Sequence, residues 1–349
     1  MSTDTPNQPA SGLIVLIPGL VPPAEMLPPL LRQASLPALS RLLSRATRVE
    51  CSGNLADPLY QAMGLTRSPD WPLAPLMLSN ADGRFAEGYW LRADPVHLRA
   101  DRDQLILVGS RGFPLHDHEA DEMIDAFNHH FADDQLSLHR TDAKTWYLHS
   151  ASPLDLVTVA LTDAIGKPVN SRLPAGRDAL HMHRLFNEIQ MLLFDLPANR
   201  QREREGLPTI NSIWCWGGGV LPVPAGAGRP QNLICQQPDW AAIARGAGWQ
   251  VHALPDQTRA LPETGWLLLD HLAEHAQYGD YTGWLDSIQQ LDQQWLAPLL
   301  QQLGNGQRKQ LEIRGSTSQG EVVCWRLQRR DLWYFWRNAP LQQRLVRTG

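Results

Sequence analysis

A five-residue apolar run near the start of the chain limits its fold more than any other feature. The run is Leu13–Ile17, and Pro18 and Gly19 end it. A continuous apolar run bounded by Pro and Gly is typical of a strand buried on both faces of a parallel sheet. Residues 36–47 follow with a proline in the first turn and leucines at helical spacing, which predicts a helix. A strand, a loop and a helix in this order favour an α/β fold.

The remaining pattern alternates strands and helices at both ends of the chain and is less regular in the middle. We expect a flexible N-terminus at 1–12, an α/β core built from 13–80 and 210–349, and an inserted or accessory region at 81–209. Further predicted strands are 75–78, 105–108, 145–149, 212–216, 250–253 and 266–269. Predicted helices are 117–131, 177–196, 241–247 and 281–303, and the Pro/Gly/Ala-rich segment 223–231 is a predicted loop.

The charge balance argues against a protein built mainly to coat nucleic acid. Its 349 residues carry 31 basic and 36 acidic side chains, for a net charge of -5. Coating nucleic acid needs a surplus of cations. A local surplus exists from Gln301 onward, where nine Arg or Lys residues face three acids.

The cysteines and the apolar run suggest the compartment. Cys51, Cys215, Cys235 and Cys324 lie far apart, with no spacing typical of a zinc site. The run at 13–17 is too short for a membrane span or a signal-peptide core. We therefore expect a cytoplasmic protein with reduced thiols and no membrane contact.

The densest polar cluster consists of Arg92, Asp94 and His97. An arginine, a carboxylate and an imidazole within six residues can bind phosphate, order a general base or supply metal ligands. The alternative is a turn at Asp94–Pro95 that an Arg–Asp pair closes.

A second cluster lies on the helix predicted at 177–196. Its candidate site residues are Asn187, Glu188 and Gln190, beside an apolar stripe. A solvated helix face is one interpretation. A half-buried seam is the other, and there Glu188 would be a buried carboxylate that demands partners.

The most distinctive stretch runs from Asn211 to Gly219. Glycines at a strand end let backbone N–H groups approach an anion closely, although the stretch matches neither a Walker loop nor a dinucleotide-binding fingerprint. A structural turn or bulge is the alternative. Its candidate residues are Asn211, Trp214, Trp216, Gly217, Gly218 and Gly219.

Aromatic and arginine side chains alternate near the C-terminus. Such spacing suits base stacking with phosphate neutralisation, or a protein interface anchored by Trp and Arg. The alternative is a pair of closing strands whose Trp side chains fill the core. The residues are Arg329, Arg330, Trp333, Trp336 and Arg337.

Several of these stretches together resemble a bacterial family of RpfE-type regulatory proteins, which is phosphoglycerate mutase-like. They are residues 36–39, 90–98, 187–193, 211–219 and 333–337. That family in turn resembles the cofactor-independent phosphoglycerate mutases of the alkaline phosphatase superfamily. The resemblance implies an α/β core and a two-metal phosphoryl-transfer site.

The chain departs from this pattern at the implied metal ligands. The resemblance implies an Asp before the Gly that follows the first strand, where this chain has Pro18. It also implies an Asp-His pair at a late strand, which corresponds to Leu311–Gly315 and holds neither residue there. Asp270, His271 and His275 are the residues left to form part of such a site. Losing ligands from both groups should cost most of the metal affinity.

The departures favour a non-catalytic regulatory or partner-binding protein, a pseudoenzyme that needs no cofactor and binds a protein or a small anion. A divergent phosphomutase or phosphatase with two divalent ions, such as Mn²⁺ or Zn²⁺, is the first alternative. The second is a DNA-repair-associated protein or nucleic-acid binder that uses the basic C-terminal segment.

Overall fold

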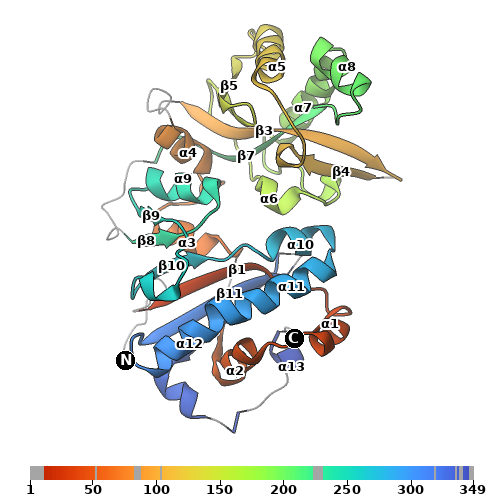
Figure 1. The fold of residues 1–349 in the computed structure, drawn as a ribbon. Coiled ribbons are helices and arrows are strands. Elements are labelled where there is room, and N and C mark those ends of the chain that lie inside the picture. The colour runs from red at the N-terminus through yellow and green to blue at the C-terminus, as the bar shows by residue number, and fades with distance from the viewer. Residues whose placement is uncertain are drawn as a thin grey trace. The chain divides into compact units, whose positions relative to one another are not determined.

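The chain forms two compact units, each built around its own β-sheet (Figure 1). Unit 1 comprises Met1–Met63, Ala227–Ala244 and Gly248–Gly349, and unit 2 comprises Gly64–Gly226 with Arg245–Ala247. The α/β class predicted from the sequence is confirmed. The computed structural model describes residues 12–51, 53–81, 88–102, 104–222, 231–317, 320–334, 336–337 and 341–345. The predicted flexible N-terminus, apart from residue 12, and the predicted loop, apart from residue 231, lie outside the described residues.

The boundaries of the units differ from the expected core and insertion. Two elements expected in the core, α4 (Leu73–Ala81) and β7 (Ser212–Gly219), lie in unit 2. The reason is pairing, because β7 is antiparallel to β3 (Tyr89–Asp101) and α4 packs on both strands. The strand predicted at 75–78 is wrong, since that apolar run lies inside α4.

Unit 1 contains a seven-stranded sheet in the order β2-β12-β11-β1-β10-β8-β9. The predicted first strand is β1 (Leu13–Val21), and it lies parallel to both β10 and β11. Strands β12 and β2 add to the β11 side in antiparallel fashion. The other strands are β2 (Thr47–Val49), β8 (Asn232–Ile234), β9 (Gln250–His252), β10 (Gly265–Leu268), β11 (Gln310–Thr317) and β12 (Val322–Gln328).

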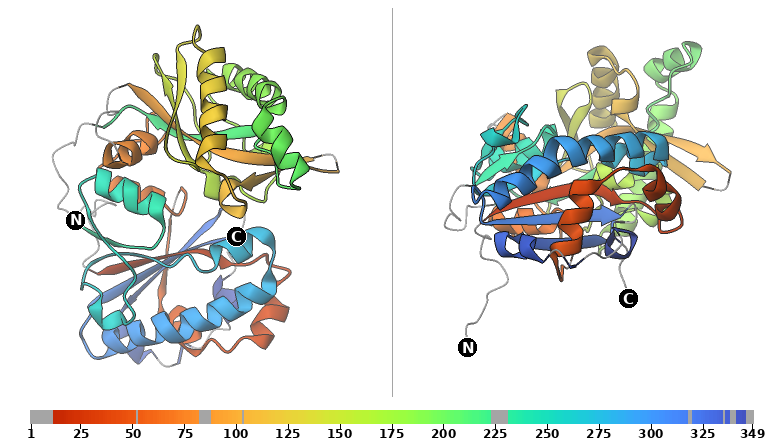
Figure 2. Two further views of the ribbon diagram at one scale, coloured as in Figure 1. Left: turned by 45° about the horizontal axis from the view of Figure 1, so that its top comes forward. Right: turned by 60° about the horizontal axis from the view of Figure 1, so that its bottom comes forward.

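Several helices of unit 1 bury one face of this sheet. Alternate β1 residues, such as Leu13 and Val15, share a core with apolar residues of α2 and α11. The long helix predicted at 281–303 is two helices joined by a π-helical turn, and it lies along the sheet (Figure 2). The helices are α1 (Leu27–Gln33), α2 (Pro37–Arg45), α3 (Asp57–Ala62), α9 (Pro238–Gly246), α10 (Ala273–Tyr278), α11 (Tyr281–Leu291), η5 (Asp292–Leu296), α12 (Ala297–Gly304) and α13 (Leu341–Leu345), with short turns η4 (Thr258–Ala260) and η6 (Arg329–Trp333).

Unit 2 contains a five-stranded sheet in which β3 is the central long strand. Strands β4 and β6 flank β3, β5 pairs with β6, and β7 also pairs with β3. The predicted turn at Asp94–Pro95 is wrong, because β3 runs straight through it with Pro95 opposite Ile213. A residue before proline prefers extended backbone, so this dipeptide suits a strand as well as a turn. The other strands are β4 (Gln104–Gly109), β5 (Leu136–Asp142) and β6 (Thr145–Ser150).

Helices α5 and α7 cover one face of the sheet of unit 2. Met123 and Phe127 of α5 share a core with Leu185 and Ile189 of α7 and with alternate strand residues such as Leu91. The polar segment after α7 forms a helix of its own, α8. The helical elements are α5 (Asp117–His130), α6 (Leu161–Ala164), α7 (Ala179–Phe194) and α8 (Pro197–Arg204), with the short turns η2 (Ser110–Gly112) and η3 (Val169–Ser171).

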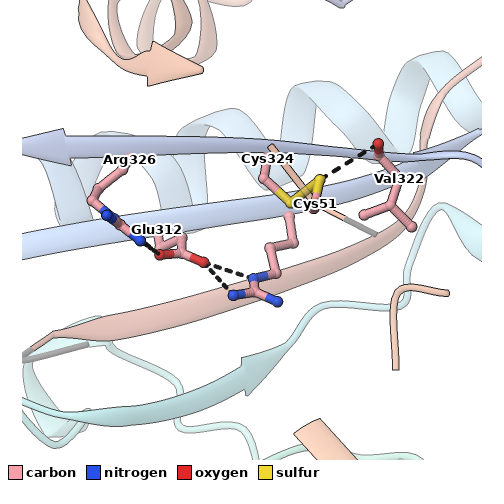
Figure 3. Close-up of a disulfide and its surroundings, with 6 residues drawn as sticks. Cys51, Glu312, Val322, Cys324 and Arg326 are labelled. Atoms are coloured by element: carbon pink, nitrogen blue, oxygen red, sulfur yellow. Dashed lines mark hydrogen bonds and ion pairs between the residues drawn. A yellow bond between two sulfur atoms is a disulfide. The ribbon is translucent and has the colours of Figure 1, made fainter. Parts of the chain in front are cut away.

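One pair of cysteines differs from the expectation of reduced thiols. Cys51, just after β2, forms a disulfide with Cys324 of β12 (Figure 3). Cys215 and Cys235 are buried and lie outside this disulfide. Within the described part of the chain, none of the helices has the length and apolar character needed to cross a bilayer.

Candidate functional site

The predicted Arg92–Asp94 pair exists, and Trp216 joins it in the interior of unit 2. The Arg92 guanidinium lies 2.7 Å from the Asp94 carboxylate, and the indole N–H of Trp216 donates to the other carboxylate oxygen at 2.6 Å. The strand register brings them together, since Arg92 lies opposite Trp216 and Asp94 lies opposite Trp214. We call these three residues the β3–β7 polar cluster.

The β3–β7 polar cluster is closed to solvent. Its three residues are 5%, 2% and 5% exposed. Arg92 also lies 5.4 Å from the ring centroid of Tyr147 and within hydrogen-bond distance of Thr145. A buried carboxylate that balances a buried guanidinium, with an indole N–H as further donor, satisfies its own charges. The cluster therefore holds β3, β6 and β7 together and offers no open position for a ligand.

His97 and Asn211 do not join this cluster. The His97 imidazole lies 2.8 Å from the carbonyl oxygen of Thr209. The Asn211 side chain accepts from the backbone N–H of Leu98 at 2.7 Å and donates to the Leu98 carbonyl at 3.0 Å. Asn211 thus continues the β3–β7 pairing with its side chain, just before β7 begins.

The three glycines end β7 inside the sheet and do not form an open loop. A Cβ on Gly219 would lie 2.6 Å from Pro72 Cβ, and one on Gly218 would collide with the Tyr89 hydroxyl. Gly217 has φ +66°, and its N–H donates to the Thr158 hydroxyl at 2.9 Å. Close packing therefore explains why these positions are glycine, in agreement with the interpretation of the stretch as a structural turn or bulge.

A buried carboxylate that the sequence did not reveal supports this strand end. Asp70 is 5% exposed and accepts from the backbone N–H groups of Trp71 and Thr158 and from the Thr158 hydroxyl. Burial raises the pKa of Asp70, and these hydrogen bonds oppose the rise. The partners lie 88 residues apart, so no local pattern marks the pair.

Two histidines beside Trp90 form a second feature that sequence reasoning missed. The ring of Trp90 lies 4.6 Å from that of His149 and 5.3 Å from that of His139, measured between centroids. Burial lowers the pKa of both histidines, and the charge of His149 lowers that of His139 further. Side chains alternate between the two faces of a sheet along each strand, and this alternation along β5 and β6 is the sequence signal that could have predicted both histidines on the same face.

Asn187 and Glu188 lie on the exposed face of α7, and Gln190 is half-buried. The interpretation of Glu188 as a buried carboxylate is wrong. The helix turns Leu185, Phe186 and Ile189 into the core of unit 2, which leaves the neighbouring positions facing solvent. These polar residues therefore belong to a surface of unit 2.

The carboxyl end of β1, where the resemblance implies metal ligands, is filled by packed side chains. The Gly19 N–H donates to Ser316 Oγ at 3.2 Å, and the Gly19 carbonyl accepts from the Trp284 indole at 2.8 Å. A Cβ at Gly19 would lie 2.8 Å from Ala276 Cβ and 2.9 Å from the Leu272 carbonyl oxygen. Trp284 and Leu272 are fully buried, so this strand end is part of the core.

The neighbouring strand β11 places a cation beside this position. Arg314 lies opposite Leu16 in the sheet, and its guanidinium is 2.6 Å from the carboxylate of Glu312. The same carboxylate accepts from Arg326 of β12 (Figure 3), and Arg314 lies opposite Cys324 in the sheet. Arg314 also lies 5.7 Å from the ring centroid of Trp266. A guanidinium repels divalent cations, and Glu312 is already paired.

The remaining ligand candidates of unit 1 do not complete a metal site. His275 Nδ1 lies 2.8 Å from Asp280, whose other carboxylate oxygen accepts from the Gly283 N–H at the start of α11. That backbone hydrogen bond, followed by the one to His275, lowers the pKa of Asp280. Among the described residues, no group of three His, Cys, Asp or Glu side chains is placed to hold a metal. These residues do not fit two divalent ions.

The C-terminal candidates lie at the surface of unit 1. Trp333 is 76% exposed and Trp336 is 65% exposed, so the interpretation of closing strands whose Trp side chains fill the core is wrong for these two residues, although it holds for Trp325 of β12, which is 1% exposed. Arg337 lies 4.5 Å from the ring centroid of Tyr334, which packs against Trp336. The terminal Arg/Trp surface, as we call it, consists of Arg329, Arg330, Trp333, Trp336 and Arg337.

Helix α2 adds positive charge next to the terminal Arg/Trp surface. Arg45 donates to the Leu332 carbonyl at 2.6 Å, and burial, followed by the charge of Arg41, lowers the pKa of Arg45. The one acid within this segment, Asp331, is buried and accepts from the backbone N–H of Gln328. The exposed charge around the two tryptophans is therefore positive.

Comparison with curated proteins finds local similarity to phosphoglycerate mutases. The chain is 38% identical over 68 residues to the 2,3-bisphosphoglycerate-independent phosphoglycerate mutase of Methanothrix thermoacetophila, which is 20% of this chain and 17% of that protein. It is also 38% identical over 60 residues to the probable mutase of Geobacter sulfurreducens, 17% of this chain and 15% of that protein. The matches thus span less than a fifth of each relative.

Two solved structures are also similar. The cofactor-independent phosphoglycerate mutase from Thermoplasma acidophilum aligns over 91% of this chain and 90% of its own, with 14% identity and a TM-score of 0.42. The PH0037 protein from Pyrococcus horikoshii aligns over 91% and 87%, with 14% identity and a TM-score of 0.48. No family model matches the chain. The RpfE-type assignment stays a prediction, and the local sequence similarity supports a phosphoglycerate mutase-like scaffold.

Proposed function

We propose that this chain is a partner-binding protein on a phosphoglycerate mutase-like scaffold and that it does not catalyse two-metal phosphoryl transfer. One observation carries the second part of the proposal, the loss of two-metal catalysis. At the carboxyl end of β1, Pro18 occupies the implied ligand position, and the adjacent Gly19 is held by two hydrogen bonds and by close packing against Leu272 and Trp284. A catalytic metal pair needs anionic or imidazole ligands around an open position, and this strand end supplies neither.

Metal content and turnover test this proposal together. The purified full chain, dialysed against Mn²⁺ or Zn²⁺, should retain no stoichiometric metal by elemental mass spectrometry. It should also fail to interconvert 2- and 3-phosphoglycerate, or to hydrolyse a panel of phosphate esters.

Stoichiometric metal with turnover would overturn the proposal in favour of a divergent phosphomutase or phosphatase. In that case Asp270→Asn and His275→Ala should each abolish turnover and metal binding. His97→Ala tests whether a ligand comes from unit 2 instead.

A second candidate function is nucleic-acid binding through the terminal Arg/Trp surface. Its support is the exposure of Trp333 and Trp336 beside arginines. Exposed rings can stack on unpaired bases while guanidinium groups neutralise phosphates, which suits a single strand better than a duplex.

Fluorescence titration with a single-stranded oligonucleotide tests this function. Trp333→Ala should weaken binding by about 1–3 kcal/mol, and Arg330→Ala should reduce the dependence of affinity on salt. Arg200→Ala, an exposed arginine of α8 in unit 2, is the matched control and should leave binding unchanged. Binding that does not depend on salt, or an equal loss of affinity in Arg200→Ala, would reject nucleic-acid binding through this surface.

A further inference from the structure

Helix α7 presents a second apolar stripe that unit 2 does not use. Its buried face carries Met182, Leu185, Phe186, Ile189 and Leu193. On the opposite side, Leu180, Met191 and Phe194 are 61%, 68% and 72% exposed. Large apolar side chains at such exposure, repeated along one helix, are typical of a surface that another helix covers.

The exposed residues follow the spacing of a helix–helix seam. Leu180, Arg184, Asn187, Met191 and Phe194 are all exposed, and successive members are four, three, four and three residues apart. This alternation keeps side chains on one line along a helix that packs against a partner at a shallow angle. The seam spans 15 residues of α7, or about 22 Å.

The two ends of the seam are symmetric about its middle residue, whereas Arg184 and Met191 lie three residues before and four residues after that residue. Asn187 lies in the middle, and Leu180 and Phe194 lie seven residues before and after it. We propose that two copies of this chain associate through α7, antiparallel, with Asn187 on the two-fold axis. Leu180 of each copy then packs against Phe194 of the other, which is the self-complementary arrangement of a two-fold interface.

The charges on α7 favour a second copy as the occupant and select the antiparallel direction. Arg184 and Glu188 are both exposed and lie on opposite sides of the centre. In the antiparallel pair Arg184 of each copy approaches Glu188 of the other, which gives two equivalent ion pairs. A parallel pair would instead place Arg184, which lies in the seam, against Arg184 of the other copy, and like charges disfavour it.

The oligomeric state of the full chain tests the first part of the proposal. Light scattering over a micromolar to submillimolar series should show the mass rising from 39.1 kDa towards twice that value. A single-helix seam is small, so we expect a weak dimer. Met191→Glu with Phe194→Glu should hold the chain at the monomer mass, while Tyr278→Glu, at an exposed aromatic residue of unit 1, should not.

Cysteine cross-linking tests the direction of the helices. Asn187→Cys should form a disulfide-linked dimer under mild oxidation, and Leu180→Cys alone should not. A mixture of Leu180→Cys and Phe194→Cys chains should cross-link to each other.

Three outcomes would overturn the proposal. They are a monomer at every concentration, a dimer that the Met191 and Phe194 substitutions leave intact, or efficient self-linking of Leu180→Cys. The exchange of Arg184→Glu with Glu188→Arg in one chain should restore the dimer that Arg184→Glu alone weakens. Failure of that rescue would also count against the antiparallel pair.

Discussion

Each unit carries an ion pair between residues two apart on a strand, and the two pairs differ in how much water reaches them. In unit 2, Arg92 and Asp94 form one balanced pair, both at most 5% exposed. In unit 1, Glu312 is 2% exposed but serves two guanidinium groups, and the side chain of Arg326 is 42% exposed. The same spacing thus yields a closed structural cluster in one sheet and a cluster with excess positive charge in the other.

The difference shows why an Arg–carboxylate pattern does not by itself identify a functional site. Both arginines lie near an aromatic ring, Tyr147 for Arg92 and Trp266 for Arg314. What separates the clusters is the number of charges and their access to solvent, and those depend on the neighbouring strands.

The largest expected effect comes from removing the carboxylate of each cluster. Asp94→Ala should lower the free energy of unfolding by about 3–5 kcal/mol, because it leaves the Arg92 charge buried without compensation. Glu312→Ala should cost less, about 1–3 kcal/mol, because Arg326 can reach water. Urea unfolding measures both, with hydrogen exchange to assign each loss to its unit. Equal losses of unfolding free energy in the two variants would contradict the expected difference between the two clusters.

Reduction of the disulfide should affect only the cluster of unit 1. The Cys51–Cys324 bond closes a loop of 273 residues, and replacing both cysteines by serine should destabilise unit 1 by about 2–4 kcal/mol. Hydrogen exchange should rise in β11 and β12 and stay constant around Arg92. The same double variant supplies the control. Because it lacks the disulfide, adding a reductant should not lower the stability of unit 1 any further.

The close packing beside the β3–β7 polar cluster gives a smaller effect. Gly219→Ala would bring a Cβ within 2.9 Å of the Pro72 backbone, and the overlap should cost about 1–3 kcal/mol. Gly112→Ala in the same unit is the control, because its nearest neighbour is a Val108 methyl carbon at 4.0 Å. A neutral Gly219→Ala would instead indicate that this strand end is open.

The smallest effect concerns pH. Burial lowers the pKa of His149 below its ordinary value of 6.5, so the unfolded chain binds more protons there than the folded chain. The stability this group contributes is present above about pH 6.5 and is lost as pH falls through the lowered pKa. His149→Phe should therefore flatten the decline in stability of unit 2 on acidification. An unchanged slope in pH-dependent urea unfolding would contradict this.

Regular patterns in the sequence predicted much of the fold, and long-range pairing decided the rest. The apolar run at Leu13–Ile17 and the leucines of α2 predicted β1 and α2 because local periodicity determines both. Asp94–Pro95 predicted a turn, but pairing with β7 keeps β3 extended there. Asp70 and Thr158 had no local signal at all.

The candidate site was predicted less well than the fold. The sequence identified Arg92 and Asp94 as partners, yet it did not reveal that Trp216 and Tyr147 close the cluster. For Glu188 and Trp333 the error was one of exposure, because an amphipathic pattern does not say which faces stay uncovered.

The disulfide has a topological consequence for the way the two units are joined. Unit 1 is assembled from chain segments on both sides of unit 2, and Cys51 lies in the first segment while Cys324 lies in the last. A protease that cuts once within unit 2 therefore produces two fragments that remain one covalent molecule. They should migrate together on a denaturing gel without reductant and separate when a thiol is added.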